Sequence, residues 1–445
     1  MIALWLACVP TDVTNRPDST GSTDHPPTTS SRELGTVRLA DAGSAAGIGA
    51  AGTVIGGVLE AADLDGDGAP ELLIGIPGSG RMAIGPPVAD GLPAGASVGS
   101  VADEHGASVA VGDWDRDGRV DWWVGAPGGM GAVVAGTGVP VGDAVATVSI
   151  QGLGERFGAS VAVLEDVDGD GQGELLVGAP DCGAGCGLGS AYLISDPLQP
   201  DLANALRWLG SAGAGTGSNV ASLGDLNGDG ISDLGIGSPG QTAGAALSGR
   251  ADVFYGPLAG SVAPIPDLAL ATEEAGDRVG HVIASGGDDD GDGYGSVVVS
   301  APGALDARGK LFTLRAPLRD AFLQVADGRV EGDKEGDGLA DSVDSGDLDD
   351  DGLSDLVIGV RSADAGGSDA GAVYVWYGPM IGLKPAASAD WVIQGDVAGD
   401  GLGSAVAAGL GTAGGDPLWA ASWQGTGLGA QTGVGAVHLV AGALD

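Results

Sequence analysis

Short apolar runs recur along the chain between clusters of glycine, proline and aspartate. Runs such as ELLIGIP, DWWVGAP and ELLVGAP are rich in β-branched, aromatic and leucine residues and end at a proline. Alternating segments such as GSAYLIS and GAVYVWYG follow them, and the apolar period of an amphipathic helix is absent throughout. The pattern therefore predicts an all-β protein made of short strands.

These runs belong to a repeated unit. A nine-residue acidic pattern precedes each run, and successive copies begin about 50 to 63 residues apart. Each unit contains four strand-like segments, one before the acidic pattern and three after it. A repeat of this period, with four short strands per unit, is typical of the blades of a β-propeller. The six copies begin at Asp63, Asp113, Asp166, Asp225, Asp288 and Asp347.

The end of the chain predicts one more blade. Gly401–Asp445 contains three strand-like runs and no acidic pattern, so it forms a seventh blade without an outermost strand. The segment TVRLADAG, Thr36–Gly43, precedes the first unit as ATVSIQG precedes the third, and we expect it to supply the missing strand by pairing near Val434–Ala441. Such pairing removes the exposed edges of an open ring. The sequence thus predicts a closed seven-bladed β-propeller over residues 36–445.

The acidic pattern, D-x-D-x-D-G-x-x-[DE], suits calcium. Carboxylates at alternate positions repel one another unless a cation lies between them, and Ca²⁺ takes about six to eight oxygen ligands. We expect side-chain oxygens from positions 1, 3, 5 and 9 and a backbone carbonyl from position 7, with glycine permitting the sharp turn. The sequence predicts about six Ca²⁺ ions, held by loops between the first two strands of six blades.

The expected ligands are Asp63, Asp65, Asp67, Ala69 and Glu71; Asp113, Asp115, Asp117, Arg119 and Asp121; Asp166, Asp168, Asp170, Gln172 and Glu174; Asp225, Asn227, Asp229, Ile231 and Asp233; Asp288, Asp290, Asp292 and Tyr294; and Asp347, Asp349, Asp351, Leu353 and Asp355. Asn227 replaces an aspartate in the fourth loop, and Ser296 replaces the closing carboxylate in the fifth. Both loops should bind calcium more weakly, the fifth most of all. The similar stretch Asp333–Asp341 falls where a turn before the sixth blade belongs, and we expect that turn there.

Residues on either side of the acidic pattern carry a family resemblance. These residues are Phe157-Gly158 with Gly178-Ala179-Pro180, His105-Gly106 with Gly125-Ala126-Pro127, and more weakly Val279-Gly280 with Ser300-Ala301-Pro302. They resemble the FG-GAP repeat of integrin alpha-chain β-propellers and their bacterial relatives, and the resemblance covers roughly residues 36–445. The resemblance implies a disc of blades with calcium loops on one face and ligands bound at the opposite face. In three repeats the phenylalanine of the Phe-Gly motif is replaced, by His105, Val279 and Leu339.

The net charge narrows the choice of partners. The chain has 60 acidic and 18 basic residues and a formal charge of −42. Of the acidic residues, 22 are expected calcium ligands, and six bound Ca²⁺ would leave a charge of about −30. Phosphate binding needs clustered Lys and Arg, so nucleic acid is excluded as a partner.

The N-terminus predicts export. Residues 1–8, MIALWLAC, resemble a truncated bacterial lipoprotein signal with Cys8 as the lipidated residue; the alternative is an apolar leader with a free thiol. Residues 9–35 are rich in Ser, Thr, Pro and Asp and predict a disordered tether. We expect an extracytoplasmic protein, as a cell-surface or outer-membrane lipoprotein or secreted, that contacts the membrane only through the lipid.

Cys182 and Cys186 lie in DCGAGCG, after the second strand of the third blade. In an exported protein such a pair is expected to form a disulfide. The alternative, a metal site, needs further thiol or imidazole ligands, which the neighbouring sequence does not supply.

Two classes of function fit these features. The first is a monomeric adhesion-like binding module, tethered to the surface, whose loops opposite the calcium rim contact an unknown protein or glycan. The second is a calcium-dependent polysaccharide lyase or hydrolase on the same scaffold, and a structural cell-surface-layer role also stays open. No catalytic motif emerges, so the sequence predicts no enzyme. The presented loops lie around Gly78, Gly128, Cys182–Cys186, Gly240–Gly249, Gly303–Arg308 and Ser362–Gly371.

Overall fold

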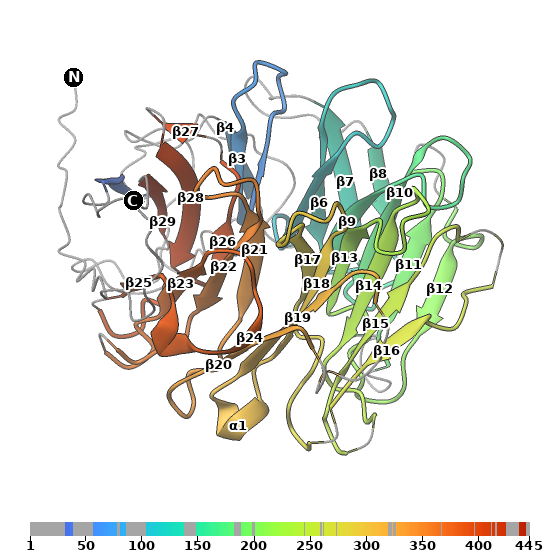
Figure 1. Cartoon of the computed structure of the whole chain (residues 1–445). Coiled ribbons are helices and arrows are strands. Elements are labelled where there is room, and N and C mark those ends of the chain that lie inside the picture. Colours follow the sequence, from blue (N-terminus) through green and yellow to red (C-terminus); the bar gives the residue numbers. More distant parts are fainter. Residues whose placement is uncertain are drawn as a thin grey trace.

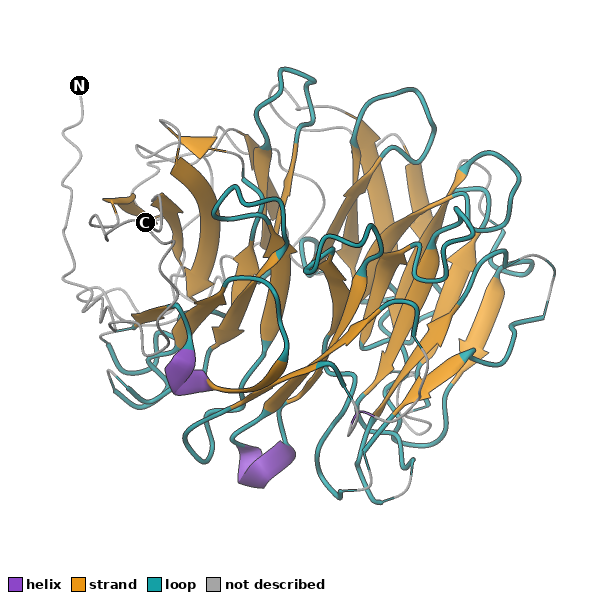
Figure 2. Ribbon diagram, in the orientation of Figure 1, coloured by secondary structure: helices purple, strands orange, loops and turns teal. Residues whose placement is uncertain are grey.

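The computed structural model describes residues 32–38, 57–77, 81–85, 104–137, 148–181, 188–197, 201–318 apart from 244, 259, 261 and 273, 323, 326–410 apart from 366 and 396, 412–413, 416–423 and 436–441. Strands dominate this part of the chain (Figure 2), and the helical segments within it are short: α1 (Ala304–Ala307) and a 3-10 turn at Ala386–Ser388. The all-β prediction is confirmed.

Four sheets are antiparallel meanders of four strands each, joined in chain order. They are β5 (Ser108–Gly112), β6 (Asp121–Ala126), β7 (Ala132–Thr137) and β8 (Val148–Gln151); β9 (Ser160–Glu165), β10 (Gly173–Ala179), β11 (Ser190–Ile194) and β12 (Leu206–Leu209); β13 (Asn219–Gly224), β14 (Asp233–Ser238), β15 (Arg250–Phe254) and β16 (Leu268–Leu270); and β21 (Ser342–Gly346), β22 (Asp355–Val360), β23 (Ala372–Trp376) and β25 (Trp391–Gln394).

Two further sheets have five strands. In one, β17 (Ile283–Gly287), β18 (Ser296–Ala301), β19 (Lys310–Arg315) and β20 (Gly328–Glu331) form the meander, and β24 (Gly382–Pro385) adds to β20 in parallel. In the other, β26 (Ala405–Ala407), β28 (Asp416–Trp423), β29 (Ala436–Ala441) and β1 (Arg32–Arg38) lie side by side, and β27 (Thr412–Ala413) pairs with β28. The strand colours follow one another around the molecule in Figure 1. This is a β-propeller.

The described strands complete six blades of four or more strands, where the sequence predicts seven blades. The remaining sheet, β2 (Leu59–Ala62), β3 (Glu71–Ile76) and β4 (Arg81–Gly85), has three. Residues 86–103, which follow this sheet in the chain, lie outside the described residues. The propeller is therefore established, and six of its blades are complete in the described residues.

The first and last parts of the chain meet in one sheet. Thr36 pairs with His438 and Arg38 with Ala436, as the sequence predicts. The strand begins earlier than expected, at Arg32, which lies inside the segment predicted as a tether, because β29 continues to Ala441 and offers Arg32 a partner there. Residues 39–43 lie outside the described residues.

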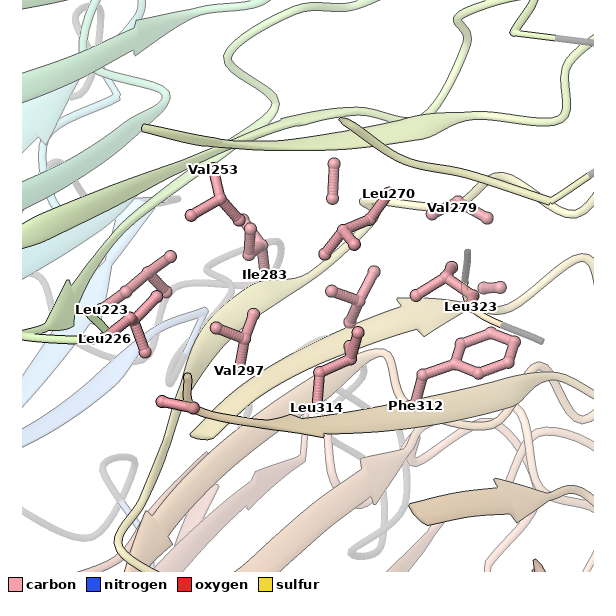
Figure 3. Packing of buried hydrophobic residues seen from close by; sticks show 14 of the residues in the cluster. Leu223, Leu226, Val253, Leu270, Val279, Ile283, Val297, Phe312, Leu314 and Leu323 are labelled. Atoms are coloured by element: carbon pink, nitrogen blue, oxygen red, sulfur yellow. The ribbon is translucent and has the colours of Figure 1, made fainter. Parts of the chain in front are cut away.

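Adjacent blades pack through apolar faces. Leu223, Val253 and Leu270 of one blade face Ile283, Val297 and Phe312 of the next (Figure 3), and this cluster is almost fully buried. A similar cluster joins the β2–β4 sheet to the last blade, where Leu59 and Ile74 pack with Ala405, Ala420 and Val437. Burial of this apolar surface is the main stabilising contribution to the ring.

The FG and GAP glycines lie where blades approach most closely. Gly158 donates its N–H to Gly178 O in its own blade at 3.0 Å, and its carbonyl lies against Gly125 of the preceding blade. A Cβ on Gly125 would stand 2.0 Å from that oxygen. The same contact recurs between Gly178 and Gly217 and between Gly359 and Gly403. The motif is therefore a packing device, because backbone contacts backbone only where no side chain intervenes.

Candidate functional site

Six acidic loops, each spanning the nine-residue pattern, join the first and second strands of consecutive sheets. They connect β2 to β3, β5 to β6, β9 to β10, β13 to β14, β17 to β18 and β21 to β22. Because each loop joins equivalent strands of an equivalent meander, all six lie at the same end of their blades. This is the position that the sequence predicts for them.

Backbone N–H groups hold the carboxylates of each loop together. Asp63 accepts hydrogen bonds from Gly66 N at 2.7 Å and Gly68 N at 2.9 Å, and both glycines have positive φ. Asp65 accepts from Asp67 N, and Asp67 in turn accepts from Ala69 N. The later loops repeat this pattern, so the fold of each loop follows from its own aspartates and glycines.

The structure brings carboxylates together in five of the six loops. In each, three or more acidic side chains offer oxygens within 4.8 Å of one another. The groups are Asp63, Asp65 and Glu71; Asp113, Asp115 and Asp121; Asp166, Asp168, Asp170 and Glu174; Asp288, Asp290 and Asp292; and Asp347, Asp349 and Asp351. Asp67, Asp117 and Asp355 are predicted ligands outside these groups. In the fourth loop Asn227 donates its amide N–H to Asp229 at 3.1 Å.

Buried carboxylates with unused oxygens close the second and third loops. Glu174 is fully buried; one oxygen accepts from Val167 N, and Oε1 has no hydrogen-bond partner. Asp121 is 1% exposed, and neither of its carboxylate oxygens has a hydrogen-bond partner. Burial and the neighbouring aspartates raise the pKa of Glu174 to about 8 and that of Asp121 to about 7. Buried, unpaired carboxylates beside other carboxylates fit a bound cation.

Asp233 and Asp355, which close the fourth and sixth loops, are placed differently. Asp233 accepts one hydrogen bond from Leu226 N at 2.8 Å and another from Gly256 N at 2.9 Å. Asp355 likewise accepts from Leu348 N and Gly378 N. In each residue one carboxylate oxygen thus binds the backbone of its own loop, and the other binds the turn after the third strand of the blade. These two residues, predicted as chelating ligands, tie the loop to the blade in this structure.

The fifth loop contains a positive charge of its own. Position 2 of this loop is Asp289, where the other loops have Leu, Trp or Val, and it is 3% exposed. Arg315 Nη2 lies 2.8 Å from Asp289 Oδ2, and Nη1 lies 3.1 Å from Asp290 Oδ2. Arg315 pairs with Ser296, the residue that replaces the closing carboxylate. Sequence reasoning missed this arrangement, although an acidic residue at an otherwise apolar position was the signal for it.

The stretch Asp333–Asp341 is a turn, as the sequence predicts. It joins β20 to β21, and Gly336 and Gly338 donate N–H groups to Ala307 O at 3.1 and 2.8 Å. It therefore belongs to the end of the blades opposite the six acidic loops. Cys8, Cys182 and Cys186 lie outside the described residues. Within the part of the chain that the structure describes, no helix has the length and apolar character needed to span a bilayer.

Comparison with known proteins agrees with this geometry. The FG-GAP repeat profile matches residues 157–194 and 339–376, the second beginning at the buried Leu339. The chain is 34% identical over 160 residues to integrin alpha-PS5 of Drosophila melanogaster, covering 34% of this chain and 15% of that protein. It is 35% identical over 215 residues to integrin alpha-IIb of Mus musculus, covering 45% of this chain and 20% of that protein.

Two other similarities are more distant. Phosphatidylinositol-glycan-specific phospholipase D of Mus musculus is 28% identical over 187 residues, covering 38% of this chain and 22% of that protein. The solved structure of the Dos1 propeller has a TM-score of 0.40 and 12% sequence identity, and the match covers 83% of this chain and 74% of that chain. The chain thus spans about a fifth or less of the length of the integrin chains that it matches.

The fold and the loops define an all-β propeller with one acidic rim. Two segments of the chain match the FG-GAP repeat model, and part of the chain is similar in sequence to integrin alpha chains.

Proposed function

We propose that this protein is a calcium-stabilised, adhesion-like binding module, which contacts a protein or glycan partner at the rim opposite the acidic loops. The observation that carries the proposal is the pair of buried closing carboxylates in the acidic rim, Asp121 and Glu174, which have oxygens without hydrogen-bond partners. A rim whose carboxylates are committed to cations serves stability, and it leaves the loops at the other end free to vary and bind. The similarity to integrin alpha chains supports the adhesion-like part of this proposal.

We propose that five of the six acidic loops each bind one Ca²⁺ ion. The first three loops offer oxygens from a closing carboxylate together with two or three aspartates, and the sixth offers three aspartates. The fourth binds through Asp225, Asn227 and Asp229. In the fifth loop Arg315 takes the place of the ion, so the proposal is about five Ca²⁺ ions rather than six.

The proposed ring has seven blades and is monomeric. In this proposal Cys182 and Cys186 form a disulfide. We propose binding rather than catalysis. The phospholipase D relative is matched over 22% of its length, so its activity is not transferred to this chain.

The proposed location is outside the cytoplasm, with the chain anchored through Cys8. Weak oxygen-rich loops fill at extracellular calcium concentrations, which agrees with export. Mass spectrometry of the membrane fraction from the native host should find a diacylglyceryl adduct on Cys8. A mature soluble form that retains Met1 would contradict anchoring.

The proposed function is tested by screening the protein against glycan and surface-protein panels, with and without calcium. We expect at least one specific partner, whose binding weakens when calcium is removed because the loops lose their support. Changes to exposed residues of the opposite rim, such as Leu247→Ala, should weaken binding without changing the melting temperature. Partner contacts that map to the acidic loops would show that the assignment of the rims is wrong.

A further inference from the structure

The first strands of the blades pack on one another in a closed ring and so surround the axis of the propeller. β17 and β21 are neighbours in this ring (Figure 1). An acidic loop follows the end of each of these strands, so the chain enters each strand from the opposite rim. Residues just before β17 and β21 therefore lie near the axis on the rim opposite the acidic loops.

Three residues at this place differ in kind from their counterparts in other repeats. His281 and Asp341 directly follow Val279-Gly280 and Leu339-Ala340. In the repeats for which the structure describes the corresponding residue, it is small: Ala107, Ala159, Ser218 and Ser404. Arg361 follows β22, at a place where the other repeats have proline: Pro77, Pro127, Pro180, Pro239 and Pro302. The repeat itself therefore does not require titratable side chains here.

Two arginines act on both His281 and Asp341. Arg361 donates its backbone N–H to Asp341 Oδ2 at 3.1 Å, and Arg278 belongs to the turn that enters β17. Burial, together with the charges of Arg278 and Arg361, lowers the pKa of His281 to about 4. Burial raises the pKa of Asp341, and the same two arginines oppose that rise. The four residues thus lie together, and we call them the arginine cluster.

The positive charge of the arginine cluster is not balanced within it. Arg278 and Arg361 are exposed, and neither forms an ion pair or a side-chain hydrogen bond with a described residue. His281 is neutral at pH 7, so of the four residues only Asp341 can offset the two arginines. In a chain with a formal charge of −42, this is a local excess of positive charge. Guanidinium groups bind carboxylates through parallel N–H donors, so the cluster suits a carboxylate.

An exposed apolar side chain adjoins the arginine cluster. Arg278 donates its backbone N–H to Leu247 O at 3.2 Å, and Leu247 is 55% exposed. The carboxylate of an acidic sugar is surrounded by hydroxyl groups, which an exposed leucine does not complement. In a protein, an acidic side chain can stand beside apolar ones, and arginine is enriched in protein interfaces. The combination favours a protein partner over an acidic glycan.

We propose that the arginine cluster binds the carboxylate of an Asp or Glu side chain on a protein partner, with an apolar residue of the partner against Leu247. The proposal deepens the proposed function, on which it rests for the use of this rim. Arg278 and Arg361 contact the carboxylate from two neighbouring blades. Asp341 holds the backbone of Arg361 in place through the hydrogen bond to its N–H.

The test is saturation-transfer NMR on the full chain in calcium. The probes are two acetylated, amidated pentapeptides, Gly-Leu-Asp-Leu-Gly and its counterpart Gly-Leu-Asn-Leu-Gly. We expect only the Asp peptide to bind, and Arg278→Ala and Arg361→Ala each to weaken its affinity by about tenfold or more, since each removes a charged donor. The matched control is Arg308→Ala, which removes the same charge from an exposed residue of the same rim, outside the cluster. It should leave the affinity unchanged.

Both cluster variants should keep the melting temperature, because the side chains are exposed and Arg361→Ala retains the N–H that Asp341 accepts. The inference is overturned if neither peptide binds, if the Asp and Asn peptides bind equally, or if Arg308→Ala weakens binding as much as the cluster variants do. Binding of glucuronate in place of the Asp peptide would also overturn it, in favour of an acidic glycan. A protein partner whose calcium-dependent binding survives both cluster variants would reject this site and leave the calcium-stabilised binding module standing.

Discussion

Removing calcium with a chelator is expected to lower the melting temperature of the protein by on the order of 10 °C. A ligand that binds only the folded state, at ten times its dissociation constant, adds about 1.4 kcal/mol per site. Several loops contribute, and the carboxylates that they leave unneutralised repel one another. Differential scanning calorimetry in calcium and in chelator measures the effect, and unchanged melting on chelation would refute the stabilising role.

The stability of the calcium-free protein should depend on pH, and this dependence is a second test of the acidic loops. Burial raises the pKa of Glu174 to about 8 and that of Asp121 to about 7 in the folded state, above their ordinary values. The folded chain therefore holds more protons than the unfolded chain between about pH 4.5 and pH 8, and its stability falls as the pH rises through this window. In calcium this fall should be reduced, because the ions favour the deprotonated carboxylates.

Variants localise the effect to a single loop. Asp166→Asn combined with Asp170→Asn should remove the third site and lower the sensitivity to chelation by about one site's contribution, roughly 1.4 kcal/mol. The matched control is Asp306→Asn, which removes one charge from an exposed residue of α1, outside the acidic loops. Its response to chelation should equal that of the unchanged protein.

Arg315→Ala is expected to destabilise the protein by about 3 to 5 kcal/mol, because it leaves Asp289 buried without its partner. Denaturant unfolding measures this loss. Arg329→Ala is the control, since the Arg329–Glu331 pair is more exposed and should contribute about 1 kcal/mol or less. A loss for Arg315→Ala no larger than that of the control would contradict the role of Arg315 as a resident cation.

A triple variant tests whether Arg315 takes the place of calcium. Arg315 donates its backbone N–H to Asp327 as Tyr255 does to Asp267 and Tyr377 to Asp390, so these three residues occupy equivalent places. Combining Asp289→Leu, Ser296→Asp and Arg315→Tyr gives the fifth loop the pattern of the sixth. Calcium titration should then count one more ion than the unchanged protein binds, about six instead of five. If the unchanged protein binds six calcium ions, Arg315 does not take the place of calcium in the fifth loop.

The repeat and the local form of each acidic loop are predictable from the sequence alone. Alternating apolar residues specify short strands, and the aspartates and glycines of each acidic loop make their own hydrogen bonds within nine residues, as at Asp63 and Gly68. These interactions are local in the chain, so their pattern is readable without the fold. The pairing of Thr36 with His438 was also predictable, because a ring of repeats leaves one place for an unmatched strand.

Which charged groups contact one another depends on how the blades pack. Asp289 reaches Arg315 from 26 residues away in sequence, and it also accepts from Met380 N, 91 residues away. Asp355 forms hydrogen bonds with Gly378, and Arg250 and Asp252 line a cavity against a neighbouring blade. The acidic pattern shows how many carboxylates each loop contains. Whether those carboxylates contact a cation, an arginine or a backbone N–H depends on the strands that pack beside the loop. That choice depends on contacts between distant segments, which the spacing of residues within one repeat does not encode.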